Sequence, residues 1–152
     1  MQLDVIDKKL INLLQNNSKQ TTKQLSIALN LSVTAVYERI KKLEKEGVIE
    51  KYVAIIDKNK IEKSFLVFCH VKLIQHTKEN VSTFEREILK LEEVSECFHV
   101  SGEYDYILKV YVKDMEQYRT FMVTKLTAIK YIGSTHSTFA IEKVKNTTAI
   151  SL

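Results

Sequence analysis

The stretch Thr21–Gly47 reads TTKQLSIALNLSVTAVYERIKKLEKEG and decides the fold of the first part of the chain. A threonine at its start can cap a short helix, and Leu25, Ile27, Ala28 and Leu29 supply that helix with apolar residues. Asn30-Leu31-Ser32 then predicts a tight turn, because Asn tolerates the left-handed backbone and Ser is a favourable N-cap.

The helix that follows this turn has one apolar face and one polar face. Val36, Ile40 and Leu43 recur at helical spacing and predict the buried face, and Gly47 is a typical glycine just after a helix end. Two helices joined by a turn of about four residues form a helix-turn-helix. A preceding helix is predicted over residues 3–15, and Val48–Ile56 is predicted to be a strand that serves as a wing or as a connector.

The polar face of the second of these helices carries the candidate DNA contacts, which are Thr34, Ala35, Tyr37, Glu38, Arg39, Lys41 and Lys42. Thr and Ala can contact thymine methyl groups, Arg can bind guanine through two hydrogen bonds, and Lys can neutralise phosphate. Arg39 is the natural candidate for guanine, and the helix N-terminus at Ser32 can meet a phosphate. The same pattern also suits a three-helix bundle with a solvated charged face.

Charge and composition agree with a nucleic-acid partner for this half. Residues 1–60 hold 11 basic and 7 acidic side chains, whereas residues 61–152 hold 12 of each. A basic surplus indicates nucleic acid or a membrane surface. The polar helix leaves no apolar face for lipid once its apolar residues enter the core, so membrane binding is not expected.

The remaining composition describes a globular chain of one or two domains. Of the 152 residues 45% are apolar, and no apolar run reaches the length of a membrane span. The two cysteines form no CxxC pair, and the start of the sequence lacks the pattern of a signal peptide, so a reduced, cytoplasmic protein is expected. We divide it into residues 1–60, which bind DNA and include the connecting strand, and residues 61–152.

The second part alternates strand-like and helix-like stretches. Strands are predicted over residues 65–74, 94–101, 105–112 and 132–144, with helices starting after the caps Thr77 and Asp114. The order β-α-β-β-α-β is the ferredoxin-like split βαβ motif, which makes the chain an α+β protein. The strands carry apolar residues on both faces, and two helices cover only one. A homodimer through the sheet is therefore expected, unless the N-terminal part folds back over that face.

The chain resembles the Lrp/AsnC (feast/famine) family of transcription regulators. The similarity runs over Leu3–Tyr52, over LEEVSECFHVSGEYDYILKVYVKDMEQY (Leu91–Tyr118) and over the terminal EKVK (Glu142–Lys145). It implies a winged helix-turn-helix joined by a strand to a βαββαβ ligand-sensing (RAM-type) domain that dimerises and often assembles into tetramers or octamers. The sequence departs from the family pattern at Glu103, where Asp is usual, at Asn30, where Gly is common, and at Lys130-Tyr131, where Pro-Gly is customary.

The resemblance also implies an amino-acid effector held between dimers. Its candidate site residues here are Ser101, Gly102, Glu103, Tyr104, Asp105, Thr127, Thr138, Phe139 and Ala140. Physically, a glycine lets backbone N–H groups approach a carboxylate, and Asp105 offers a negative partner for an α-ammonium group. The alternative is a hairpin in which Gly102 and Asp105 serve only the turn.

No enzyme chemistry is evident in the sequence. Cys97 and His99 share a strand face without further metal ligands, His76 and His136 stand isolated in the sequence, and no Walker loop or GxGxxG occurs. We expect no metal, no cofactor and no catalytic residues. Two alternatives stay open. The first is an enzyme, because relatives of this architecture include tetrapyrrole (sirohaem) decarboxylases. The second is a purely structural dimer module, which would show no DNA affinity.

Overall fold

The computed structural model describes residues 2–152, which form two compact units. The first contains the chain up to Ile55 together with Val144–Leu152, and the second contains Ile56–Lys143. The sequence predicted two continuous stretches with a boundary at residue 60. In the structure the last nine residues belong to the first unit instead.

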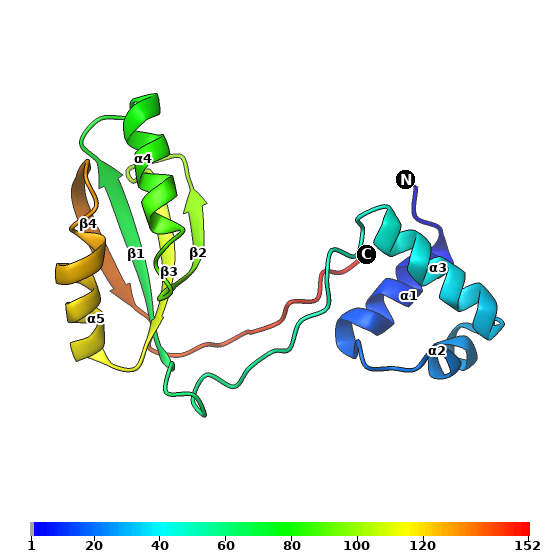
Figure 1. The fold of residues 1–152 in the computed structure, drawn as a ribbon. Helices are drawn as coiled ribbons and strands as arrows, with labels where there is room; N and C mark the ends of the chain where they lie inside the picture. Colours follow the sequence, from blue (N-terminus) through cyan, green and yellow to red (C-terminus); the bar gives the residue numbers. More distant parts are fainter. Residues whose placement is uncertain (1) are drawn as a thin grey trace. The chain divides into compact units, whose positions relative to one another are not determined.

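The first unit is a three-helix bundle, consisting of α1 (Val5–Asn16), α2 (Thr22–Leu29) and α3 (Val33–Lys45) (Figure 1). Each helix begins at a side-chain cap, because the first N–H groups of a helix have no partner within it. Asp4 and Thr21 form reciprocal capping boxes with the third residue of their helices, and Ser32 accepts a hydrogen bond from the Ala35 N–H at 3.1 Å.

The turn between α2 and α3 has the backbone that the sequence predicts. Asn30 ends α2 in the left-handed conformation, with φ 54° and ψ 48°, and Gly47 follows α3 at φ 71°. The core beneath the helices consists of Leu10, Ile11, Leu14, Leu25, Leu29, Val36 and Leu43. Because Val36 and Leu43 of α3 are buried in this core, the opposite face of α3 is exposed to solvent.

The predicted strand over Val48–Ile56 is wrong in this chain, because residues 50–57 have no regular secondary structure. A strand needs a neighbour to satisfy its backbone groups, and no other segment among residues 2–152 pairs with this one. Val53, Ile55 and Ile56 are consequently more than half exposed despite their β-branched, apolar side chains.

The second unit is a four-stranded antiparallel sheet in the order β2-β3-β1-β4 (Figure 1). Its elements are β1 (Phe65–Leu73), α4 (Lys78–Ile88), β2 (Val94–His99), β3 (Tyr106–Val112), α5 (Met115–Phe121), the π-helical turn η1 (Met122–Leu126) and β4 (Ile132–Phe139). This confirms the predicted βαββαβ order. The last strand ends at Phe139 rather than at Val144, because β1 begins at Phe65 and offers no partner beyond the bond from Ala140 N to Leu66 O.

The helices cover one face of this sheet. Alternate residues of β1 and β3, such as Val67, Cys69, Leu108 and Val110, are completely buried against α4, α5 and η1. The intervening residues form the open face, which we define as Leu66, Phe68, His70, Phe98, Ile107, Lys109 and Tyr111. Phe98 is half exposed on this face, as expected for a surface that still needs a cover.

Candidate nucleic-acid interface and effector loop

The outward face of α3 carries most of the predicted DNA contacts. Ser32, Thr34, Tyr37, Glu38, Lys41 and Lys42 are exposed, and Ala35 is half-buried. Lys45 lies on the same face, four residues after Lys41, and the sequence analysis missed it although the helical period would have placed it there.

Lysines on this face differ in how their charge is balanced. Lys41 Nζ lies 3.0 Å from Glu44 Oε2, which raises the pKa of Lys41 and lowers the pKa of Glu44. Glu44 also accepts a hydrogen bond from the Tyr52 hydroxyl at 3.1 Å. Lys42 has no ion pair within residues 2–152, so its ammonium group is open to a phosphate.

Arg39 does not occupy the outward position that the sequence analysis gave it. It lies three residues after Val36 and four before Leu43, both completely buried, so the helical period turns it toward α1. Its Nη1 donates to Asp4 Oδ2 at 2.7 Å and to Asp7 Oδ1 at 2.5 Å. Hydrogen bonds from the Asp7 N–H and from Arg39 lower the pKa of Asp4, and both carboxylates raise the pKa of Arg39.

This ion pair links the capping box of α1 to α3. Asp7 is a buried carboxylate, with only 4% of the residue exposed, and a charge in that position requires a partner. Arg39 supplies that partner, so its evident role is to hold α3 against α1.

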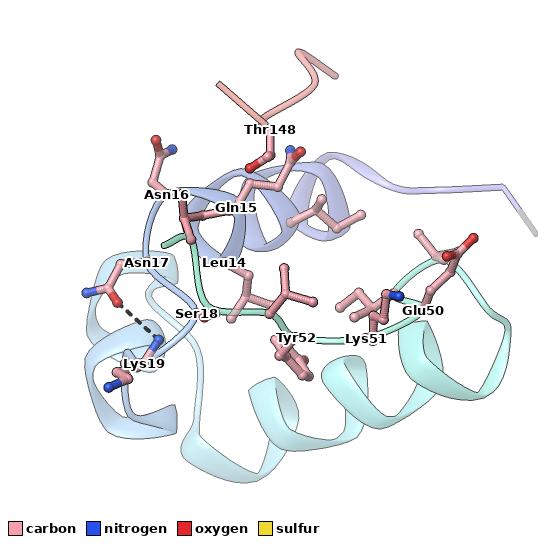
Figure 2. Close-up of a pocket in the computed structure, with 15 residues that line it drawn as sticks. Leu14, Gln15, Asn16, Asn17, Ser18, Lys19, Glu50, Lys51, Tyr52 and Thr148 are labelled. Carbon is pink, nitrogen blue, oxygen red and sulfur yellow. Dashed lines mark hydrogen bonds between the residues drawn. The ribbon is translucent and has the colours of Figure 1, made fainter. Parts of the chain in front are cut away.

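A cavity of about 470 Å³ lies in the first unit behind the turn after α1 (Figure 2). Its lining includes Asn16 at the end of α1, Asn17 and Lys19 from that turn, the chain after α3 from Val48 to Val53, and Thr148. None of the predicted DNA-contact residues lines it. Beside it, the Gln15 carboxamide donates to Ile150 O at 2.9 Å and accepts from Ile150 N at 2.7 Å, which fastens the C-terminal segment to α1.

The predicted effector loop connects β2 to β3. Ser101, Gly102 and Glu103 are exposed, and Gly102 has φ 127°, a conformation that side chains disfavour. Tyr104 and Asp105 are half-buried. The loop therefore presents backbone and a carboxylate to solvent at one end of the sheet.

Asp105 is already engaged within the chain. Its Oδ2 accepts from the Leu73 N–H at 2.8 Å, which ties the end of β1 to the start of β3, and its Oδ1 lies 3.2 Å from His76 Nδ1. The ring of His76 in turn lies beside that of His99, tilted by 37° and with the ring centroids 5.2 Å apart. His76 is isolated in the sequence, and two loops at the same end of the sheet bring it to the effector loop.

Tyr104 joins the effector loop to the open face. Its ring centroid lies 5.2 Å from that of His70 and 6.2 Å from that of His136, and the two histidine rings are 5.9 Å apart. His136 is therefore not isolated in the fold. The register between β1 and β4, which pairs His70 with His136, could not be read from the sequence.

The other predicted effector residues lie elsewhere. Thr138 and Phe139 pair with the first half of β1, whereas the effector loop meets its last half, about 13 Å away along the strand. Ala140 bonds to Leu66, and Thr127 uses its hydroxyl and its N–H to bind Met122 O at the end of η1. Within a single chain, Thr138–Ala140 therefore lie apart from the effector loop.

Cysteines and metal ligands add no further site. Cys69 is buried and Cys97 half-buried, and burial raises the pKa of the Cys97 thiol to about 11, so neither is a reactive thiolate. No group of three metal ligands converges in the part of the chain that the structure describes.

No helix in residues 2–152 is long and apolar enough to cross a membrane.

Comparison with protein families identifies both units. Residues 3–50 match a winged helix-turn-helix DNA-binding model, and residues 66–150 match the Lrp/AsnC ligand binding domain. The chain belongs to the Lrp/AsnC family of transcriptional regulators. This confirms the family resemblance and the fold class expected from the sequence.

Similar Lrp/AsnC proteins extend over nearly the whole chain. The leucine-responsive regulatory protein of Haemophilus influenzae is 37% identical over 150 residues, covering 99% of this chain and 90% of the relative. That of Escherichia coli K12 is 34% identical over 143 residues, covering 94% and 87%. Both are named as regulators rather than as enzymes.

Solved structures of the family share the same architecture. A transcriptional regulator of Neisseria meningitidis in complex with L-Met matches with a TM-score of 0.93 and 29% identity, covering 99% of this chain and 96% of that one. An AsnC family regulator of Agrobacterium tumefaciens matches with a TM-score of 0.93 and 32% identity, covering 97% and 96%.

Two positions at which this Lrp/AsnC chain departs from the family pattern share a backbone property. Asn30 and Tyr131 both have positive φ, 54° and 72°, at the two places where the family resemblance led us to expect glycine. Asn adopts that conformation at little cost, whereas the larger Tyr131 is strained in it.

Proposed function

We propose that the chain is a sequence-specific, cytoplasmic regulator that binds double-stranded DNA through α3. The contacts would come from Ser32, Thr34, Ala35, Tyr37, Glu38, Lys41 and Lys42. Support comes from the exposure of six of these residues and from the family's helix-turn-helix. Arg39 is left out of the set, because both Asp4 and Asp7 bind its guanidinium.

An amino acid is the effector that we propose. The match to a ligand binding domain supports an effector, and the Neisseria neighbour was solved with L-Met. The site would lie between dimers and would join the effector loop of one copy to Thr138–Ala140 of another, with Thr127 as a further contributor. What supports this arrangement is that Thr138 and Phe139 pair with the first half of β1 and so lie too far from the effector loop to meet it within one chain.

Dimers would form through the open face of the sheet, and dimers would assemble into tetramers or octamers. The observation that supports this proposal is that Phe98 on the open face is 51% exposed and that the half-buried Ile107 lies beside it. Effector binding would favour one assembly over another, and it would thereby change the spacing of the DNA-binding units.

The DNA proposal is tested by selecting binding sites from random duplexes and measuring affinity by fluorescence anisotropy. Thr34→Val and Glu38→Gln, both on exposed positions of α3, are expected to change the preferred sequence. If each is a base contact, the affinity for the original site falls by about 1–3 kcal/mol. Lys8→Gln on α1 is the control. Absence of any sequence preference in the wild type would refute the specific-regulator proposal.

The effector proposal is tested by calorimetry of the full chain with each of the natural amino acids, L-Leu and L-Met among them, in parallel with sedimentation velocity. Glu103→Gln, in the exposed part of the loop, should weaken amino-acid binding without unfolding the domain, whereas Glu79→Gln on α4 should not. If no natural amino acid binds the wild type or changes its mass, the effector proposal fails while DNA binding stands.

A further inference from the structure

A hollow of about 570 Å³ lies in the helix layer of the second unit, between α4 and the turn that follows η1. Its charged lining residues are Arg86, Glu87, Lys90, Lys125 and Lys130. All of its lining residues lie on α4, on η1 or in the turns just after these two helices, so none belongs to the open face of the sheet or to the effector loop. The dimer contact that we propose through the open face therefore does not use this hollow.

Positive charge dominates the hollow. Arg86 and Lys90 share the single carboxylate of Glu87, at 3.2 and 2.7 Å. Lys125 pairs at 2.5 Å with Glu93, which lies outside the lining. With both carboxylates counted against the four cations that line the hollow, two positive charges remain. An anion that carries two charges would balance them.

Several hydrogen-bond donors in the hollow are unpaired within residues 2–152. Glu87 accepts only from Nε of Arg86, so both Nη groups of the guanidinium lack an acceptor. Lys130 has no ion pair, and the hydroxyls of Thr83 and Tyr131 make no hydrogen bond in the same part of the chain. An arginine fork with a lysine and hydroxyl groups beside it is a typical donor set for phosphate.

Tyr131 gives an independent indication of a site. Its φ of 72° is a conformation that a large side chain adopts only at a cost, and such strain gathers at functional sites. Its carbonyl oxygen accepts from the Ile74 N–H at 2.8 Å, which helps to hold the strained backbone in place. The family resemblance led us to expect Pro-Gly where this chain has Lys130 and Tyr131. Pro-Gly would avoid the strain, but it would bring neither a cation nor a hydroxyl to the hollow.

We infer that this hollow binds a small organic phosphate monoester, a ligand separate from both the DNA and the amino-acid effector. A phosphate monoester carries a charge of about −1.5 to −2 at pH 7, which matches the excess positive charge. Arg86 and Lys130 bind the phosphate oxygens, with the Thr83 hydroxyl as a further donor. The volume suits a metabolite rather than a bare ion, and Leu91 and Ile129 supply apolar surface for the organic part.

The first experiment titrates the full chain with phenyl phosphate by calorimetry. Arg86→Gln and Lys130→Gln should each weaken binding about tenfold or more, the usual effect of losing a hydrogen bond to a charged group. Lys78→Gln, which removes a positive charge from α4 outside the hollow, should leave the affinity within about twofold of the wild type. Tyr131→Gly should also bind more weakly, and because this variant relieves strain, its weaker binding would not result from unfolding.

The second experiment repeats the titration with succinate and in the presence of other ligands. Binding of succinate as tight as that of phenyl phosphate would overturn the assignment to phosphate. Displacement of phenyl phosphate by L-Leu or L-Met would overturn it too, because the hollow would then be part of the effector site. A lower salt slope of DNA binding for Lys130→Gln would instead assign the hollow to the DNA backbone. If the wild type does not bind phenyl phosphate, the inference fails, whether or not the chain binds DNA and an amino acid.

Discussion

Replacing Arg39 by methionine should destabilise the first unit before it affects DNA recognition. The substitution keeps the apolar part of the side chain and removes both charge-assisted hydrogen bonds to α1. The bond to Asp4 contributes little, because the side chain of Asp4 is half exposed. The bond to Asp7 matters more, because the carboxylate of this buried residue keeps only the Asp4 N–H, at 3.2 Å, as a donor.

The expected loss is about 1.5–3 kcal/mol, the cost of leaving a buried charged group without its partner. For a chain of this size that corresponds to a fall in Tm of roughly 3–12 °C. Urea unfolding followed by circular dichroism measures the loss directly. Adding Asp7→Asn to the Arg39→Met variant should restore part of the stability, because the unpaired charge is gone, and the double-mutant cycle isolates the coupling.

Lys42→Met on the same helix is the matched control. Lys42 is exposed and without an ion pair in the described residues, so stability should change by less than about 0.5 kcal/mol. The salt slope of DNA binding should nevertheless fall by about 0.9 if Lys42 meets a phosphate. The reasoning on Arg39 is refuted if Arg39→Met unfolds at the wild-type urea concentration and instead loses specific DNA affinity, since Arg39 would then face a base.

Three further predictions concern stability and are measured by urea unfolding. Tyr131→Gly should stabilise the second unit by about 0.5–1 kcal/mol through relief of its positive φ, and a loss would show that its contacts outweigh the strain. Gly133→Ala should cost about 1–3 kcal/mol, since its Cβ would lie 3.2 Å from Ile74 N, while Ser134→Ala should be tolerated. Because the pKa of Asp4 is lowered from 3.8, its contribution is present above about pH 4 and is lost as the pH falls further. The difference between wild type and Asp4→Asn should therefore shrink toward pH 2.5, and a constant difference would contradict this.

The helices of the DNA-binding unit could be predicted because local rules determine them. Ser32 caps α3, Asn30 adopts the left-handed turn, and Gly47 follows the helix end, each for reasons contained within a few residues. Similarly, the order of strands and helices along the second unit follows from the alternation of strand-like and helix-like stretches. The role of Arg39 was mispredicted. Its residue type suggested a contact to guanine, whereas its position on α3, between Val36 and Leu43, turns its side chain toward α1.

Features that depend on distant segments could not be predicted from one sequence. The strand expected over Val48–Ile56 has the right residues, but a strand exists only where a neighbour pairs with it. His76 and His136 looked isolated because their neighbours come from other strands and loops. The separation of Thr138 from the effector loop also depends on the register between β1 and β4.

Because Val144–Leu152 belong to the first unit, a single cut between the units does not separate them. The second unit is an insertion within the first, DNA-binding unit, since the chain crosses between the units near Ile55 and again near Val144. A protease that cuts once in the exposed stretch around residues 50–57 leaves the second crossing intact, and the paired hydrogen bonds between Gln15 and Ile150 still contribute to the contact between the fragments. Release of a free DNA-binding fragment requires two cuts, or one cut together with loss of the hydrogen bonds between Gln15 and Ile150.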